Sequence, residues 1–183
     1  SEMTTTSFEW GAQKVALLVD TQNLYYAARG SAARAQGSGA VDYQRLLAAA
    51  VRGRRALHAT AYVVEREGDT SSYGFYAKLG ALGYRVKRKR LRVHRGDENG
   101  PVVEGDWDMG IAADMVRAMD QADVIALASG DADFVPFVEL AQQRGVRVEV
   151  LAFRDSTAQE LLDAVDVYVN LAELDGIFLS PRP

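Results

Sequence analysis

VALLVD, at residues 15–20, is the stretch of sequence that decides the fold: five apolar residues in a row end in an aspartate. A second stretch of the same kind, VIALA at residues 124–128, is followed by Ser129, Gly130 and Asp131. Continuous apolar runs bounded by polar turn residues are typical of strands that are buried on both faces. We therefore predict that both stretches are inner strands of a mostly parallel sheet.

The rest of the chain alternates between strand and helix patterns. Ser156 and Gln159 have the spacing of a capping box, which predicts that a helix begins there. The alternation predicts an α/β fold of three layers, in which helices cover both faces of the sheet. Further strands are predicted at 60–64, 84–95, 146–152 and 167–169, and further helices at 23–29, 42–50, 71–82, 109–119 and 134–144.

Length and composition limit the possible kinds of protein. The 183 residues suit one domain, which we place at 14–174, between an N-terminal tail at 1–13 and a C-terminal tail at 175–183. The chain has no cysteine, which excludes disulfides and thiolate zinc sites and fits a cytoplasmic location. No apolar run approaches the roughly 18 residues that a membrane-spanning helix needs, so we expect no membrane partner.

Aspartates follow the two predicted inner strands. Asp20 ends the first run, Asp131 and Asp133 follow the second, and Asp108 opens a predicted helix. Ligands of parallel sheets bind outside the carboxyl ends of the strands, where these side chains would converge. Carboxylates so close together repel one another unless a cation or a proton intervenes, and hard cations such as Mg²⁺ or Mn²⁺ prefer oxygen ligands. The alternative is that each aspartate caps a turn or a helix, as Asp133 could do for the helix that follows it.

The segment from residue 84 to residue 95 is strongly basic, although the chain as a whole has a net charge of −4. Cations occur on both faces of the predicted strand, which argues against a buried position and favours an exposed β-hairpin arm that pairs with 102–103. Such a density of positive charge favours contacts with RNA phosphates over the alternative, a charged edge strand that prevents aggregation. The predicted RNA-binding residues are Arg85, Lys87, Arg88, Lys89, Arg90 and Arg92.

Two tyrosines have two possible roles, and one histidine is assigned to the core. Tyr25 and Tyr26 follow the first strand, where one ring could stack on a base or both could pack in the core. His58 precedes an apolar strand and is predicted to be a core residue.

Three motifs together resemble the NYN domain, in the LabA-like group of the PIN-like nuclease superfamily. They are Val19-Asp20-Thr-Gln-Asn23, Asp108 with Asp114-Met115, and Ser129-Gly-Asp-Ala-Asp-Phe134. The resemblance extends over roughly residues 14–171. It implies a Rossmann-like, PIN-like fold and a metal-dependent ribonuclease that hydrolyses RNA with Mg²⁺ or Mn²⁺, and domains of this superfamily are often homodimers.

The resemblance also implies the residues of the site. Asn23 would orient the first aspartate or contact the substrate. The family commonly has glycine where this chain has Thr21 and lysine where it has Gly105. Asp114 lies six residues after Asp108, a rotation of about 240° around a helix, so the two cannot share one narrow stripe. The implied metal ligands are Asp20, Asp108, Asp131 and Asp133, and the candidates for supporting or substrate contacts are Asp114, Thr21 and Ser129.

Two rival functions remain after this comparison of motifs. A phosphatase with an aspartyl nucleophile usually needs a second aspartate two residues after the first, and position 22 is glutamine. A non-catalytic RNA-binding or scaffold module with a vestigial acidic site is the alternative that stays open. The chain has no glycine-rich dinucleotide motif and no P-loop, so those nucleotide-binding classes lose support.

Overall fold

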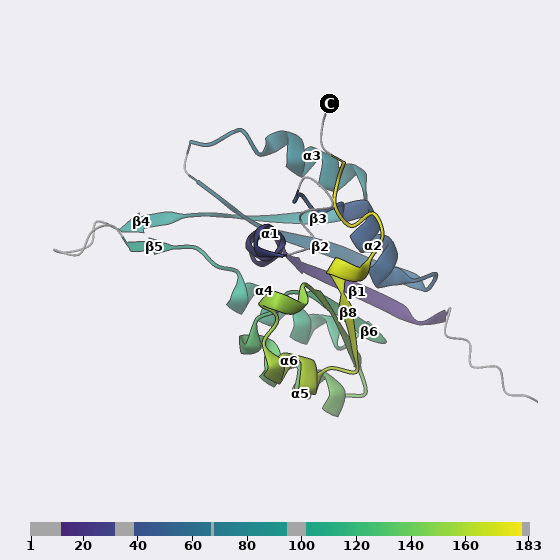
Figure 1. Cartoon of the computed structure of the whole chain (residues 1–183). Coiled ribbons are helices and arrows are strands. Elements are labelled where there is room, and N and C mark those ends of the chain that lie inside the picture. Colours follow the sequence, from purple (N-terminus) through teal and green to yellow (C-terminus); the bar gives the residue numbers. More distant parts are fainter. Residues whose placement is uncertain (1–11, 32–38, 67, 95–101, 181–183) are drawn as a thin grey trace, which may run out of the picture.

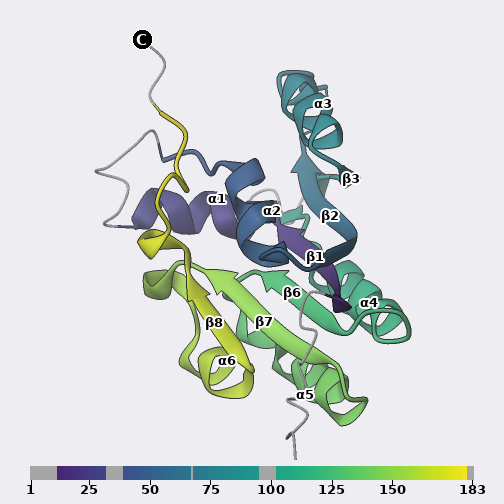
Figure 2. The ribbon, with the colours of Figure 1, turned by 90° about the vertical axis from the view of Figure 1, so that its right-hand side faces the viewer.

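The computed structural model describes residues 12–31, 39–66, 68–94 and 102–180 (Figure 1). Its centre is a six-stranded sheet in which all neighbouring strands are parallel, in the order β3-β2-β1-β6-β7-β8. Figure 2 shows β1, β6, β7 and β8 side by side in that order. The strands are β1 (Lys14–Asp20), β2 (Arg55–Glu65), β3 (Tyr84–Arg90), β6 (Val124–Ala128), β7 (Arg147–Ala152) and β8 (Val167–Asn170).

The two apolar runs form neighbouring strands at the centre of the sheet, as predicted. Val19 of β1 pairs with Ala128 of β6, and both residues are fully buried. Because the strands are parallel and in this register, the residues that follow them leave the sheet at the same edge. Asp20 and the loop that contains Asp131 therefore lie next to each other.

Helices cover both faces of the sheet and complete the three predicted layers (Figure 1). Buried residues of α1, α2 and α3, such as Leu24, Leu46 and Leu79, share one core with the sheet, and those of α4, α5 and α6 share the other. The helices are α1 (Thr21–Gly30), α2 (Tyr43–Val51), α3 (Tyr73–Ala81), α4 (Asp108–Ala118), α5 (Val135–Gln143) and α6 (Gln159–Ala164), with 3-10 helices at Ala132–Phe134, Arg154–Ser156 and Leu171–Glu173.

The predicted capping box at Ser156 is wrong. The α-helix begins at Gln159, and its N-cap residue, Ala158, makes no side-chain cap. Arg154–Ser156 forms a 3-10 helix instead, and the backbone N–H of Ala158 donates to the carbonyl of Gly130 at 3.0 Å. A contact with the loop after β6 therefore decides where this helix starts.

The basic segment is divided between two sheets, which corrects the prediction of one long strand in an exposed arm. Tyr84–Arg90 is β3, an edge strand of the central sheet that pairs with β2 from Ala59 to Glu65. The chain leaves the central sheet at Leu91, whose N–H donates to the carbonyl of Glu65 at 2.8 Å. Only the continuation forms the arm, an antiparallel pair of β4 (Arg92–His94) and β5 (Val102–Glu104) that projects from the body (Figure 1).

The expected C-terminal tail packs on the domain as far as residue 179. Ile177 is 2% exposed, and its carbonyl accepts a hydrogen bond from the N–H of Asp42. Phe178 stacks on Phe153, and the N–H of Leu179 donates to the carbonyl of Ala40. Most of the expected N-terminal tail, 1–11, lies outside the described residues. No helix among the described ranges has the length and apolar character needed to cross a bilayer.

Candidate metal centre

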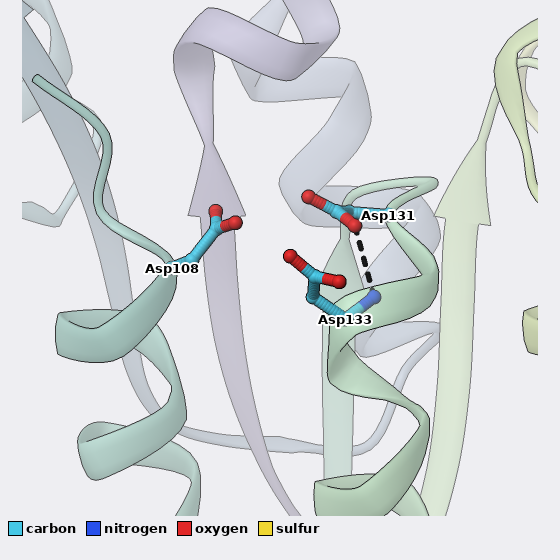
Figure 3. A group of neighbouring side chains, drawn as sticks. All are labelled: Asp108, Asp131 and Asp133. Atoms are coloured by element: carbon cyan, nitrogen blue, oxygen red, sulfur yellow. Dashed lines mark hydrogen bonds between the residues drawn. The ribbon is translucent and has the colours of Figure 1, made fainter.

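Three aspartates meet at the carboxyl edge of the sheet. Asp108 is the first residue of α4, and Asp131 and Asp133 belong to the loop after β6. One carboxylate oxygen from each lies within 4.8 Å of the other two. Figure 3 shows the three carboxylates pointing toward a common space between α4 and the loop. We call these three residues the acidic group.

The loop after β6 is fixed from two sides. Its Gly130 N–H donates to Oδ1 of Asn23 at 3.2 Å. A Cβ on Gly130 would meet the carbonyl oxygen of Ser156 and would lie 2.9 Å from Cα of Thr157, so only glycine allows this close approach. Within the loop, Ser129 Oγ accepts from the N–H of Asp131 at 3.3 Å. These contacts set the direction of the loop before any ligand binds.

Asp133 is tied to the same turn by its backbone. Its N–H donates to Oδ1 of Asp131 at 2.9 Å, which makes Asp131 the cap of the short 3-10 helix (Figure 3). The sequence alternative, in which Asp133 caps the following helix, is therefore wrong. The carboxylate of Asp133 does not cap α5. It is exposed and remains available to a ligand of the acidic group.

Asp20 lies beside the acidic group and caps α1. Its Oδ1 accepts from the N–H of Asn23 at 3.1 Å, and its side chain is largely buried. Among the residues that the structure describes, Asp20 does not belong to the set that meets within 4.8 Å. Thr21, next in the chain, donates its hydroxyl to the carbonyl of Tyr62 at 2.6 Å and so joins α1 to β2.

Trp107 and Asp106, the two residues that precede Asp108, hold it in place, and the sequence analysis assigned a role to neither. Trp107 Nε1 donates to the carbonyl of Val63 at 2.9 Å, and its ring covers Gly110, where a Cβ would lie 2.5 Å from the ring. Asp106 Oδ1 accepts from the N–H of Asp108 at 3.1 Å. The spacing Asp-x-Asp at a helix start was a usable signal, because aspartate commonly binds the backbone two residues on.

The acidic group retains a proton near neutral pH. Burial and the charges of Asp131 and Asp106 raise the pKa of Asp108 to about 7, with a hydrogen bond to Asp131 adding to the effect. Burial also raises the pKa of Asp20, partly offset by the N–H of Asn23, and Asp131 raises it further. Both shifts come first from burial, and the neighbouring carboxylates add to each; a cation in the same space would relieve that added repulsion.

The donor set fits a hard divalent cation. Because the three oxygens lie within 4.8 Å of one another, some point lies within about 2.8 Å of all three, a small contraction away from the roughly 2.1 Å that Mg²⁺ needs. All three donors are carboxylates, which suit Mg²⁺ or Mn²⁺ better than Zn²⁺. Asp108, Asp131 and Asp133 could therefore bind such an ion, with the exposed side left for water or substrate.

Asp114 belongs to a different network on α4. Its Oδ2 accepts from the Tyr62 hydroxyl at 2.7 Å and from Lys87 Nζ at 2.6 Å, and its Oδ1 accepts from Arg117 at 2.6 Å. Burial alone would raise the pKa of Asp114, but these three donors outweigh it and lower the pKa. The structure places Asp114 outside the acidic group, in agreement with the helical rotation between it and Asp108.

The cations of β3 point to two different sides. Arg88 and Arg90 lie 3.1 Å and 3.7 Å from Glu65, and the Arg88 guanidinium covers the ring of Tyr73 on α3. On the opposite side, Lys89 donates to the carbonyl of Asp106 and lies 4.7 Å from the centre of the Trp107 ring. Lys87 and Arg85 share that second side, toward α4. The side chain of Arg92 lies outside the described part of the chain.

The two tyrosines of α1 are on the surface, so the core alternative is wrong for them. Tyr25 is 52% exposed and Tyr26 is 64% exposed. Their rings meet edge to face with centres 5.4 Å apart, and Arg29 lies over the Tyr25 ring. They present an aromatic surface on the helix that begins directly after Asp20.

Comparisons with known proteins show which family the chain belongs to. The model of the NYN domain matches residues 14–172. The low amplitude and bright protein LabA of Synechococcus elongatus is 33% identical over 103 residues. The match covers 55% of this chain and 55% of LabA, so the chain spans about half the length of that relative. A crystal structure of a protein of unknown function from Vibrio parahaemolyticus has 31% identity and a TM-score of 0.76, covering 94% of this chain and 99% of the other. The family indicates a nuclease-type, RNA-related function. Because the family match includes the entire central sheet and the acidic group, the chain belongs to the NYN domain family, with the α/β fold of the PIN-like superfamily.

Proposed function

We propose that the protein is a metal-dependent ribonuclease that hydrolyses phosphodiester bonds of single-stranded RNA at the acidic group. The observation that carries the proposal is the meeting of Asp108, Asp131 and Asp133 within 4.8 Å, from two separate elements, at the carboxyl edge of the sheet. A bound Mg²⁺ or Mn²⁺ would neutralise charge on the scissile phosphate and activate a water molecule for attack. The membership of the NYN family supports hydrolysis over simple binding.

The residues of the site have different roles in this proposal. The acidic group binds the cation, and Asp20 adds negative charge through its interaction with Asp108 and Asp131. Asn23 joins the two halves of the site, because its backbone N–H binds Asp20 and its side chain binds the loop after β6. A preformed arrangement of this kind needs little reorganisation when the substrate arrives.

Exposed groups on α1 and β3 suit an RNA strand. Single-stranded RNA is commonly bound by stacking of its unpaired bases on aromatic rings and by cations that contact its phosphates. Tyr25 and Tyr26 offer exposed rings on α1, and Lys89 presents its charge beside Trp107, next to Asp108. We assign these residues to the substrate, together with the other cations of β3.

Hydrolysis of an end-labelled RNA oligonucleotide tests the proposal. Wild-type protein should cut it with Mg²⁺ or Mn²⁺ and stop in excess chelator. Asp131→Asn should fold normally by circular dichroism and lose most of the activity, because the acidic group would have one fewer anionic ligand. The matched control is Asp120→Asn, an exposed aspartate beyond the far end of α4, which should keep full activity.

Two results would decide against the proposal. Cleavage that continues in excess chelator, or in well-folded Asp131→Asn, would exclude a metal centre at the acidic group. Tight binding of RNA without any cleavage under all metal conditions would favour the non-catalytic RNA-binding or scaffold module.

A further inference from the structure

A hollow of about 480 Å³ lies beside α4, separate from the acidic group. Its floor is β2, with His58, Thr60 and Tyr62, and its walls are β3 and the later turns of α4. Asp114 lines it, six residues after Asp108, and so lies roughly 9 Å further along the helix axis. We call this space the α4–β3 hollow.

The charge of the hollow is positive. Arg85 and Lys87 from β3 and Arg117 from α4 line it together with one carboxylate, Asp114. Asp114 binds Lys87 and Arg117 directly, which orients both cations while their side chains stay 44% and 73% exposed. Arg85 and Arg117 are both exposed. An anion entering the hollow would meet a site with more positive than negative charge that is already ordered.

The floor of the hollow offers apolar and neutral polar groups. Leu57 lines it and is partly exposed, whereas the Tyr62 ring is buried and its hydroxyl is bound by Asp114. His58 is partly exposed, which corrects the prediction that it is a core residue, and within the described chain its buried Nδ1 has no hydrogen-bond partner. Burial and the charge of Arg85 lower the pKa of His58, so the ring is neutral at pH 7.

Cations, apolar groups and neutral polar groups line the hollow together, and one class of ligand matches all three. A nucleotide combines a flat apolar base, polar atoms at the edge of that base, and a phosphate. The volume also suits it, because pockets for small ligands usually have about 300–1,000 Å³. A plain inorganic anion would use only the cations and leave Leu57 and His58 without a contact.

We propose that the α4–β3 hollow is a second ligand site that binds a nucleotide, either free or as one unit of an RNA strand. Its phosphate contacts Arg85 and Arg117, and its base lies over the floor against Leu57 and His58. The site lies away from the acidic group and does not depend on hydrolysis there. As a unit of a strand, the nucleotide would hold RNA at a point distant from the cut; as a free molecule, it would be an effector.

Binding to full-length Asp131→Asn in excess chelator tests this site without the acidic metal centre, so its result does not depend on the proposed nuclease activity. Calorimetry with each of the four nucleoside monophosphates and with inorganic phosphate measures the free ligands. Fluorescence anisotropy with a labelled RNA oligonucleotide measures the strand. If the monophosphates bind, the ligand of the hollow is a free nucleotide. If only the oligonucleotide binds, the ligand is one nucleotide unit of an RNA strand.

Substitutions in the same background place the ligand in the hollow. Arg85→Ala and Arg117→Ala should each weaken binding about tenfold, the usual loss when one charged hydrogen bond to phosphate is removed. His58→Phe should change the relative affinities for the four bases. The control is Arg144→Ala, an exposed arginine at the end of α5, which should bind like the parent. The proposal is overturned if no nucleotide or oligonucleotide binds, if inorganic phosphate binds as tightly as the nucleotides, or if Arg85→Ala and Arg117→Ala bind like the control.

Discussion

The affinity of the acidic group for Mg²⁺ should depend on pH in a way that the structure specifies. Asp108 has a pKa of about 7 in the protein without metal, and a cation can bind only when that proton has left. Below pH 7, the apparent affinity should therefore fall about tenfold for each pH unit, and above pH 8 it should be nearly constant. Between pH 8 and pH 6 we expect a loss of about tenfold.

The same shift predicts how the metal affects stability. The folded-state pKa of Asp108 is raised from 3.8 to about 7, so the folded protein binds more protons than the unfolded chain in that interval. The stability of the metal-free protein should therefore fall as pH rises from about 4 through 7. Added Mg²⁺ removes this loss, so it should raise the Tm more at pH 8 than at pH 6.

Calorimetry in two buffers with different ionisation enthalpies counts the protons released when the metal binds. One proton should leave per bound ion at pH 6, and almost none at pH 8.5. Asp108→Asn should bind Mg²⁺ more weakly and without this pH dependence. An affinity that is the same at pH 6 and pH 8, with no proton release at either, would refute the assignment of the shared proton to a metal-binding carboxylate.

Three further outcomes are expected. Gly130→Ala should cost about 1–3 kcal/mol in urea unfolding and reduce RNA cleavage, because its Cβ would meet the backbone at Thr157. Asp20→Asn should impair cleavage as Asp131→Asn does, and the double variant should be little worse than either, since the two serve one unit. Glu149→Gln should lower the free energy of unfolding by about 1–3 kcal/mol, because the buried carboxylate loses its charge-assisted hydrogen bonds to Arg54 and Arg52. Burial would raise the pKa of Glu149, but the arginines hold this pKa below 4.5. The stabilisation by the Glu149 carboxylate should therefore be present above pH 4.5 and disappear as the pH falls through the lowered pKa. Acid titrations followed by circular dichroism measure this loss.

The strands that carry the site could be predicted because both of their faces are apolar. VALLVD and VIALA can bury every side chain only as inner strands, and β1 and β6 are indeed neighbours in the sheet. Parallel direction then brings Asp20 and the loop with Asp131 to one edge. The cap at Asp42 was predictable for a local reason too, because its Oδ1 accepts from two N–H groups in the next turn.

The start of α6 and the path of the basic segment depend on contacts between distant residues, so local patterns could not predict them. Ala158 binds Gly130 across the site, which moves the helix start away from Ser156. β3 joins the central sheet by pairing with β2 along its length, and Glu65 at the end of β2 pairs with Arg88 there. No local pattern in the basic segment indicates that partner, and the cations alone suggested a free arm.

One helix connects the acidic group to the α4–β3 hollow, and Trp107 lies between the two. Asp108 begins α4, Asp114 lines the hollow on a later turn, and the Trp107 ring contacts Tyr62 with a centre distance of 5.4 Å. The ring also covers Gly110, so Trp107 cannot move without disturbing the first turn of α4. A ligand that displaces Asp114, which binds the Tyr62 hydroxyl, would therefore act through Tyr62 on the residue that positions Asp108. If the hollow binds a nucleotide, linkage requires that the nucleotide change cation affinity by the same factor as the cation changes nucleotide affinity.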